Sequence, residues 1–108
     1  MGFDGEVWCV RDIEGRERVG EIVIDDADFP WLSGRFDAGP AYGAVEPLFV
    51  RELALVREED WEEWETVHAE IRRRVSMTSP DGPVAEFLLH IEGDRAWFRW
   101  SDEPFEDD

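Results

Sequence analysis

Residues 87–100 alternate apolar and polar side chains on both sides of a central Gly93-Asp94 pair. A period of two is typical of a β-strand with one buried face, and glycine at the first central position suits a two-residue type II′ turn. Counting outward from that turn places His90 opposite Trp97 and leaves one face of the hairpin wholly apolar. That face comprises Phe87, Leu89, Ile91, Ala96, Phe98 and Trp100. Because both strands agree on the apolar face, the pattern predicts the hairpin and its register.

The opposite face of this predicted hairpin is the best candidate for a binding surface. It carries Leu88, His90, Trp97 and Arg99, with Glu92 and Arg95 near the turn. Tryptophan and arginine attract each other through cation–π contacts, and both are enriched at the energetic centres of protein interfaces. Two alternatives stay open. In the first, an aromatic loop at 25–44 covers this face, which then forms a second small core. In the second, the arginines pair with Glu86 and Glu92 across strands.

The rest of the chain predicts a second hairpin, a long loop and two helices. Residues 6–13 and 18–24 are rich in β-branched and aromatic residues, which favours two strands joined by a turn at 14–17. Residues 25–44 contain three glycines, two prolines and four aromatic residues, a composition that favours an irregular loop packed against the body. Pro47 suits the first turn of a helix that runs to about residue 56, although residues 51–56 also fit a strand.

Residues 60–76 carry the clearest helical pattern. Apolar or ring side chains recur every three or four residues and form one stripe, which comprises Trp61, Trp64, His68, Ile71 and Val75. Asp60 can cap the first turn, and Glu63 three residues later completes a capping box. Acidic residues in the first turns and three arginines at the end both suit the helix dipole.

Together these elements predict one domain over residues 1–108 with an α+β fold. We expect an antiparallel sheet of about four strands, formed by the two hairpins, with two helices packed on one face. The expected order along the chain is ββ-loop-αα-ββ. Aromatic residues make up 13% of the chain, which favours a folded protein despite its high charge.

The net charge of −17 narrows the range of partners. A surface this acidic repels nucleic acid and anionic membranes, so we expect neither as a direct partner. It attracts basic partners, and the densest acidic patch comprises Glu58, Glu59, Asp60, Glu62, Glu63, Glu65 and Glu70. The alternatives are that this patch is an ordinary solvated helix and that the acidity serves only solubility.

No pattern of residues points to catalysis or to a bound metal. The sequence lacks GxSxG, HExxH, CxxC and P-loop motifs, and Cys9 has large apolar neighbours that favour a buried, inert thiol. Asp25, Asp26 and Asp28 offer the oxygen ligands that calcium prefers, but they lack the glycine and distal glutamate of an EF-hand loop. We therefore expect no catalytic residues, no metal site and no cofactor.

Two features of the sequence favour a location in the cytoplasm. The single cysteine excludes an internal disulfide and fits a reducing compartment. The first residues, MGFDGEVW, lack the basic and apolar regions of a signal peptide, and no apolar run is long enough to cross a membrane.

Two runs of sequence carry a resemblance to other proteins. DFPWLSGRF at 28–36 and HIEGDRAWFRW at 90–100 resemble segments of small, uncharacterised acidic proteins of high-GC bacteria. That resemblance implies no particular chemistry.

The sequence as a whole predicts a non-enzymatic acidic interaction module. We expect it to bind a protein partner of basic character, as an immunity protein, inhibitor or adaptor does. The residues expected to contact the partner or a ligand are His90, Trp97, Arg95, Arg99, Trp31 and Tyr42. The alternative is a small-ligand-binding domain or a small enzyme, with a pocket between the 29–42 loop and the face that carries His90, Trp97 and Arg99.

Overall fold

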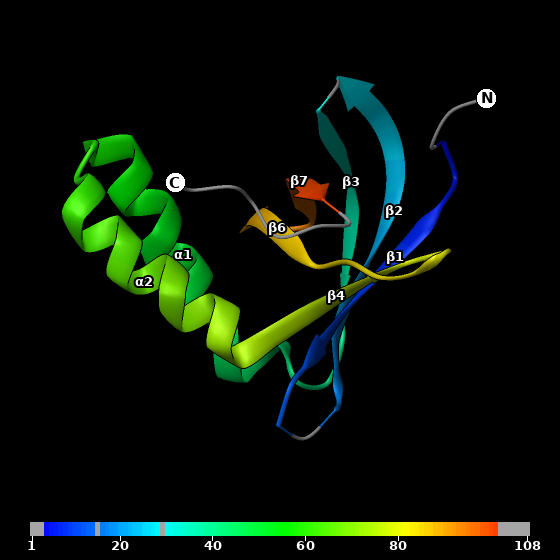
Figure 1. The fold of residues 1–108 in the computed structure, drawn as a ribbon, viewed down its shortest axis with the longest axis horizontal. Helices are drawn as coiled ribbons and strands as arrows, with labels where there is room; N and C mark the ends of the chain where they lie inside the picture. The colour runs from blue at the N-terminus through cyan, green and yellow to red at the C-terminus, as the bar shows by residue number, and fades with distance from the viewer. Residues whose placement is uncertain (1–3, 15, 29, 102–108) are drawn as a thin grey trace.

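A computed structural model describes residues 4–14, 16–28 and 30–101 of the chain. Within these ranges the chain forms seven strands and two helices in an α+β arrangement (Figure 1). In chain order they are β1 (Val7–Asp12), β2 (Arg18–Asp28), β3 (Trp31–Ala38), α1 (Tyr42–Glu58), α2 (Trp61–Arg74), β4 (Val75–Ser79), β5 (Gly82–Pro83), β6 (Glu86–Glu92) and β7 (Arg95–Ser101). Neither helix in this part of the chain is long and apolar enough to span a membrane.

All the strands belong to one antiparallel sheet with the order β5-β4-β1-β2-β3-β7-β6. The sheet curls into a half-barrel, and the helices lie at one side of it, with α1 against β6 and β2 and α2 against β4 (Figure 1). The core lies between sheet and helices. Inward side chains such as Trp8, Ile22 and Phe98 form one buried cluster with Phe49 of α1 and Ile71 of α2.

The predicted sheet of about four strands in the order ββ-loop-αα-ββ is wrong. The structure adds β3, β4 and β5, and most of the segment 25–44 belongs to the hairpin of β2 and β3. In β3 the residues Leu32, Gly34 and Phe36 are buried, so the strand alternates as an ordinary half-buried strand does. Glycine inside the strand and proline on either side of it concealed this pattern, because both are depleted in strands.

The predicted C-terminal hairpin is confirmed, including its register. Strand β6 pairs with β7 so that His90 lies opposite Trp97 and Leu89 opposite Phe98. Gly93 has a φ of 62° at the first central position of the turn. The inward residues of this hairpin are buried, apart from the half-buried Trp100.

The main helix is also close to its predicted bounds. Helix α2 begins after Asp60, whose carboxylate accepts a hydrogen bond from the backbone N–H of Glu63 at 3.3 Å. It ends at Arg74, and Val75 starts β4 instead of continuing the helix. Helix α1 begins at Tyr42, so Pro47 lies inside it and not in its first turn.

Two glycines permit the close packing of the strands around β2. A Cβ atom on Gly34 would lie 2.0 Å from the carbonyl oxygen of Val23, and one on Gly20 would lie 2.4 Å from the ring of Phe36. A β-bulge in β2 adds to the bend of the sheet at this point. The curl of the sheet therefore depends on the missing side chains at these two positions.

Replacing Gly34 with alanine should destabilise the protein, because the new methyl group would clash with backbone that cannot move aside. We expect the free energy of unfolding to fall by about 2 kcal/mol or more in urea titrations. The matched control is Gly43→Ala, because nothing lies within 4 Å of a Cβ atom on Gly43 in α1. That change should leave stability unaltered or raise it by up to about 1 kcal/mol. Equal urea midpoints for Gly34→Ala and the unsubstituted protein would contradict the packing described here.

Candidate functional site

Three neighbouring strands bring most of the predicted binding residues onto one outer face of the sheet. On this face Ser33 of β3 lies opposite Trp97 of β7, which in turn lies opposite His90 of β6. The next row places Trp31 opposite Arg99. The centre of the His90 ring lies 5.8 Å from that of Trp31, in a stacked geometry, and 5.5 Å from that of Trp97.

We call Trp31, His90, Arg95, Trp97 and Arg99 the outer aromatic face. His90 is buried, whereas both tryptophans are half-buried and both arginines are exposed. Residues 31–38 form a strand beside β7, so they lie in the sheet and do not fold over this face. The alternative in which they cover the face as part of a loop is therefore wrong. Phe29, which belongs to the same predicted segment, lies outside the described residues.

Tyr42 does not join the outer aromatic face. It is the first residue of α1 and packs edge-on against Phe36, with the ring centres 4.9 Å apart. Phe36 belongs to the buried core, so Tyr42 is on the helix side of the sheet. Burial raises the pKa of the Tyr42 hydroxyl, and the nearby carboxylate of Glu46 adds to that effect.

Arg95 and the two glutamates of the hairpin, Glu86 and Glu92, form their ion pairs with residues outside the hairpin. Arg95 makes a two-pronged contact with Asp25, at 2.6 and 3.0 Å. The hydrogen bond between them lowers the pKa of Asp25 and raises that of Arg95. Glu92 pairs with Arg57 of α1 at 2.9 Å, and Glu86 pairs with Arg72 of α2. The partners of both glutamates therefore lie in the helices and not across the hairpin. Asp25, one of the candidate calcium ligands, pairs with an arginine.

Behind the outer aromatic face lies a buried carboxylate that is not among the predicted site residues. Glu52 of α1 is only 1% exposed. One of its oxygens lies 2.9 Å from Nδ1 of His90, and the other accepts a hydrogen bond of 2.6 Å from Nε1 of Trp64 in α2. This one side chain therefore joins both helices to the edge strand of the sheet.

The sequence does contain a signal for Glu52, although it is a local one. Val45, Phe49 and Glu52 recur at spacings of four and three on the buried side of α1. A carboxylate on an apolar helical stripe is unusual, because burying a charge is costly unless it is hydrogen-bonded or paired. Its partners are 12 and 38 residues away in the chain, so no local pattern could name them.

His68 extends the same cluster along α2. Its ring stacks on that of Trp64, with centres 4.7 Å apart and planes 10° from parallel. Burial lowers the pKa of His68, and the positive charge of Arg72 lowers it further. Its Nε2 atom is buried without a hydrogen-bond partner among the described residues. These surroundings favour the neutral imidazole and suit a packed residue better than a proton donor.

A second candidate surface lies where α1 meets α2, at the end of the helix pair that points away from the sheet (Figure 1). We call it the acidic tip, and it comprises Glu58, Glu59, Asp60, Trp61, Glu62 and Glu65, all of them exposed. Trp61 is 52% exposed, so the first residue of the predicted apolar stripe is not buried. Its ring packs edge-on against that of Trp64, with centres 6.1 Å apart.

The carboxylates of the acidic tip are not paired with arginine side chains. In the ranges that the structure describes, none of them forms a salt bridge, whereas the neighbouring Glu63 pairs with Arg51 at 3.6 Å. Their negative charge is therefore not neutralised locally. The described residues also contain no group of three or more side chains that could hold a metal ion.

No protein-family model, no curated protein and no solved structure matches this chain.

Removing the Glu52 carboxylate should be strongly destabilising. Glu52→Ala leaves the Trp64 N–H and the His90 ring without their buried partner and opens a small cavity. Each unsatisfied buried group costs about 1–3 kcal/mol, so we expect the free energy of unfolding to fall by about 3 kcal/mol. Urea titration followed by circular dichroism measures this loss.

The control for that experiment is Glu46→Ala on the same helix. Glu46 is exposed, and its loss removes the same charge, so we expect a change within about 0.5 kcal/mol. If both variants unfold at the same urea concentration, the carboxylate of Glu52 does not tie the helices to the sheet.

Proposed function

We propose that this chain is a non-enzymatic interaction module that binds a protein partner of basic character through its acidic tip. The observation that carries the proposal is the exposure of Trp61 among carboxylates that have no local cation. An inhibitor or immunity protein acting on a basic protein requires a surface of this kind.

Binding at the acidic tip combines long-range attraction with short-range contacts. The net charge of −17 attracts any cationic protein, but salt screens that attraction beyond about 8–10 Å. The affinity for a cationic partner then depends on the side chains that contact it directly. At the acidic tip an arginine or lysine side chain can stack on the Trp61 ring while the surrounding carboxylates accept its hydrogen bonds. Tryptophan is also among the residues most often found at interface hot spots.

The outer aromatic face supports binding less directly. Its rings are engaged with one another, and Arg95 is held by Asp25, so less of this face is available to a partner. A contribution of Trp97, Trp31 or Arg99 to binding stays a prediction. The alternative of a small-ligand pocket under a loop at 29–42 loses support, because residues 31–38 form a sheet strand. A cytoplasmic location also stays a prediction.

The test is to measure binding of a synthetic peptide of alternating arginine and glycine residues by titration calorimetry at about 0.15 M salt. Trp61→Ala leaves the net charge unchanged, so any loss of affinity reports the ring alone. We expect the dissociation constant to rise about 2- to 30-fold, which corresponds to about 0.5–2 kcal/mol for an arginine stacked on tryptophan. The uncharged control is Val50→Ala, because Val50 is 59% exposed on α1 outside the acidic tip. Equal affinities for all three proteins would mean that Trp61 makes no contact.

A second comparison separates local recognition from net charge. Two triple variants each remove three exposed carboxylates: Glu58→Gln, Glu62→Gln and Glu65→Gln at the tip, and Glu17→Gln, Asp26→Asn and Asp28→Asn away from it. The tip variant should bind the peptide more weakly than the other. If both lose affinity equally, the peptide responds only to total charge and the tip is not a binding site.

A further inference from the structure

Most arginines of this protein pair with a carboxylate, but two arginines on one surface have no such partner among the described residues. Eight of the eleven arginines form salt bridges with carboxylates, and Arg99 has an interaction of its own. Arg11 and Arg16 form no salt bridge with any residue that the structure describes. This is unexpected in a chain with 28 acidic residues. Both arginines line the same hollow.

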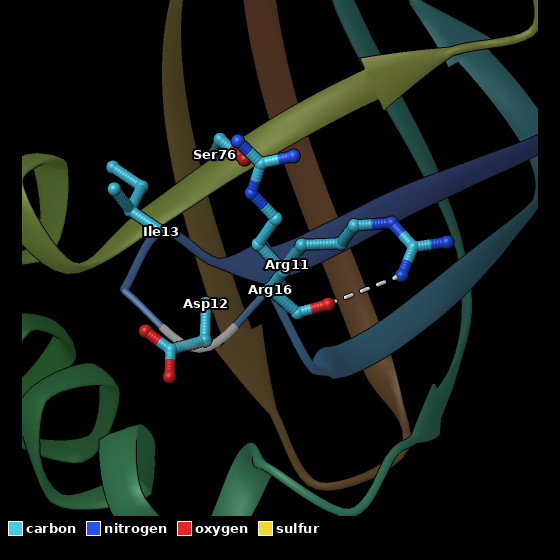
Figure 2. Close-up of a pocket in the computed structure, with 5 residues that line it drawn as sticks. All are labelled: Arg11, Asp12, Ile13, Arg16 and Ser76. Atoms are coloured by element: carbon cyan, nitrogen blue, oxygen red, sulfur yellow. Dashed lines mark hydrogen bonds between the residues drawn. The ribbon is translucent and has the colours of Figure 1, made fainter.

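The hollow lies between β1, the turn that follows it and β4. It has a volume of about 320 Å³ and is lined by Arg11, Asp12, Ile13, Arg16 and Ser76 (Figure 2). Arg11 lies opposite Ser76 in the pairing of β1 with β4, but its guanidinium group extends toward the carbonyl of Arg16, and the guanidinium drawn nearest Ser76 in Figure 2 is that of Arg16. A second hollow of about 330 Å³ adjoins it, shares Asp12 and Ile13, and brings in Glu14 together with Arg73 and Arg74 from the end of α2.

Both guanidinium groups are exposed and keep N–H donors that form no hydrogen bond with the residues that the structure describes. Arg11 donates one hydrogen bond to the backbone carbonyl of Arg16, at 3.5 Å (Figure 2). Arg16 itself has a φ of 61°, an uncommon conformation for a residue with a side chain. The one carboxylate in the hollow, Asp12, accepts a hydrogen bond from the backbone of Glu14 and points away from both guanidinium groups (Figure 2).

We propose that this hollow is a binding site for a phosphate group, held by Arg11 and Arg16 with the hydroxyl of Ser76 as a further donor. A guanidinium presents a planar fork of N–H donors that matches phosphate oxygens in pairs. Two such forks and a hydroxyl line the hollow from different elements, and the two exposed arginine side chains can turn toward a tetrahedral anion with two negative charges. Arg73 and Arg74 lie in the adjoining hollow, where their charge is offset by Asp12, Glu14 and their contacts with Glu70, so the proposal rests on Arg11 and Arg16. This inference does not rest on the proposed function, because it concerns a different surface.

The phosphate group can be free or part of a larger molecule. The exposed Ile13, which lies at the rim of both hollows, gives an apolar contact that only an organic phosphate can use. Inorganic phosphate and phenyl phosphate therefore serve as the two probes. Tighter binding of phenyl phosphate identifies an organic phosphate as the preferred ligand, and equal binding identifies the free anion.

The experiment follows backbone amide and arginine Nε–H signals by NMR while each probe is added at constant ionic strength, with chloride as the reference anion. We expect saturable shifts at Arg11, Arg16 and Ser76, with a dissociation constant on the order of 1–10 mM, because exposed charge pairs are individually weak. Arg11→Gln and Arg16→Asn should each weaken binding at least about fivefold, which corresponds to losing one charge-assisted contact. Asparagine is chosen at position 16 because it tolerates a positive φ.

The matched control is Arg35→Gln, which removes the same charge from an exposed arginine that pairs with Asp37. Its phosphate affinity should stay within about twofold of the unsubstituted protein. Should Arg16→Asn prove unfolded by circular dichroism, Arg11→Gln alone decides the outcome. The proposal is overturned if the shifts at Arg11 and Arg16 do not saturate, or if Arg11→Gln and Arg35→Gln bind phosphate equally well.

Discussion

The arrangement of helices and sheet depends on one buried carboxylate. Glu52 contacts Trp64 on the other helix and His90 on the edge strand, and it is almost completely shielded from water. Burying a charge is unfavourable unless its hydrogen bonds are satisfied, so the three side chains specify one another. These hydrogen bonds also fix the orientation of the helix pair relative to the sheet. With Trp64 anchored, Trp61 and its acidic neighbours are carried to the end of the pair, where they face solvent.

Helix α2 then separates two surfaces of opposite character. Its first turn contributes Glu62 and Glu63, and its last turn contributes three arginines, which is the arrangement that the helix dipole favours. Fourteen residues at about 1.5 Å each place the two ends about 21 Å apart. The acidic tip lies at one end and the arginine-lined hollows at the other. A charge pattern that stabilises the helix thus also keeps a candidate cation-binding surface apart from a candidate anion-binding one.

The sequence predicts those parts of the fold whose signals are local and mutually consistent. The β6–β7 hairpin follows from two strands that agree on one apolar face, and α2 follows from a helical stripe with a cap at Asp60. Strand β3 is missed because Gly34 and its flanking prolines resemble a loop, whereas the glycine is needed where the strands pack closely. Trp61 follows the helical period of α2, but period alone cannot tell that the helix extends beyond the sheet at that end. Glu52 is missed because its importance depends on partners distant in the chain.

The central claim is that Glu52 and His90 form one energetic unit that joins helix to sheet. A double-mutant cycle measures this most directly, with the free energies of unfolding of Glu52→Ala, His90→Ala and the double variant compared with that of the unsubstituted protein. Residues in one hydrogen-bonded network couple by about 0.5–3 kcal/mol. We expect the double variant to lose at least about 1 kcal/mol less than the sum of the two single losses. Additivity to within about 0.3–0.5 kcal/mol would show that the two side chains act independently, and would contradict the central claim.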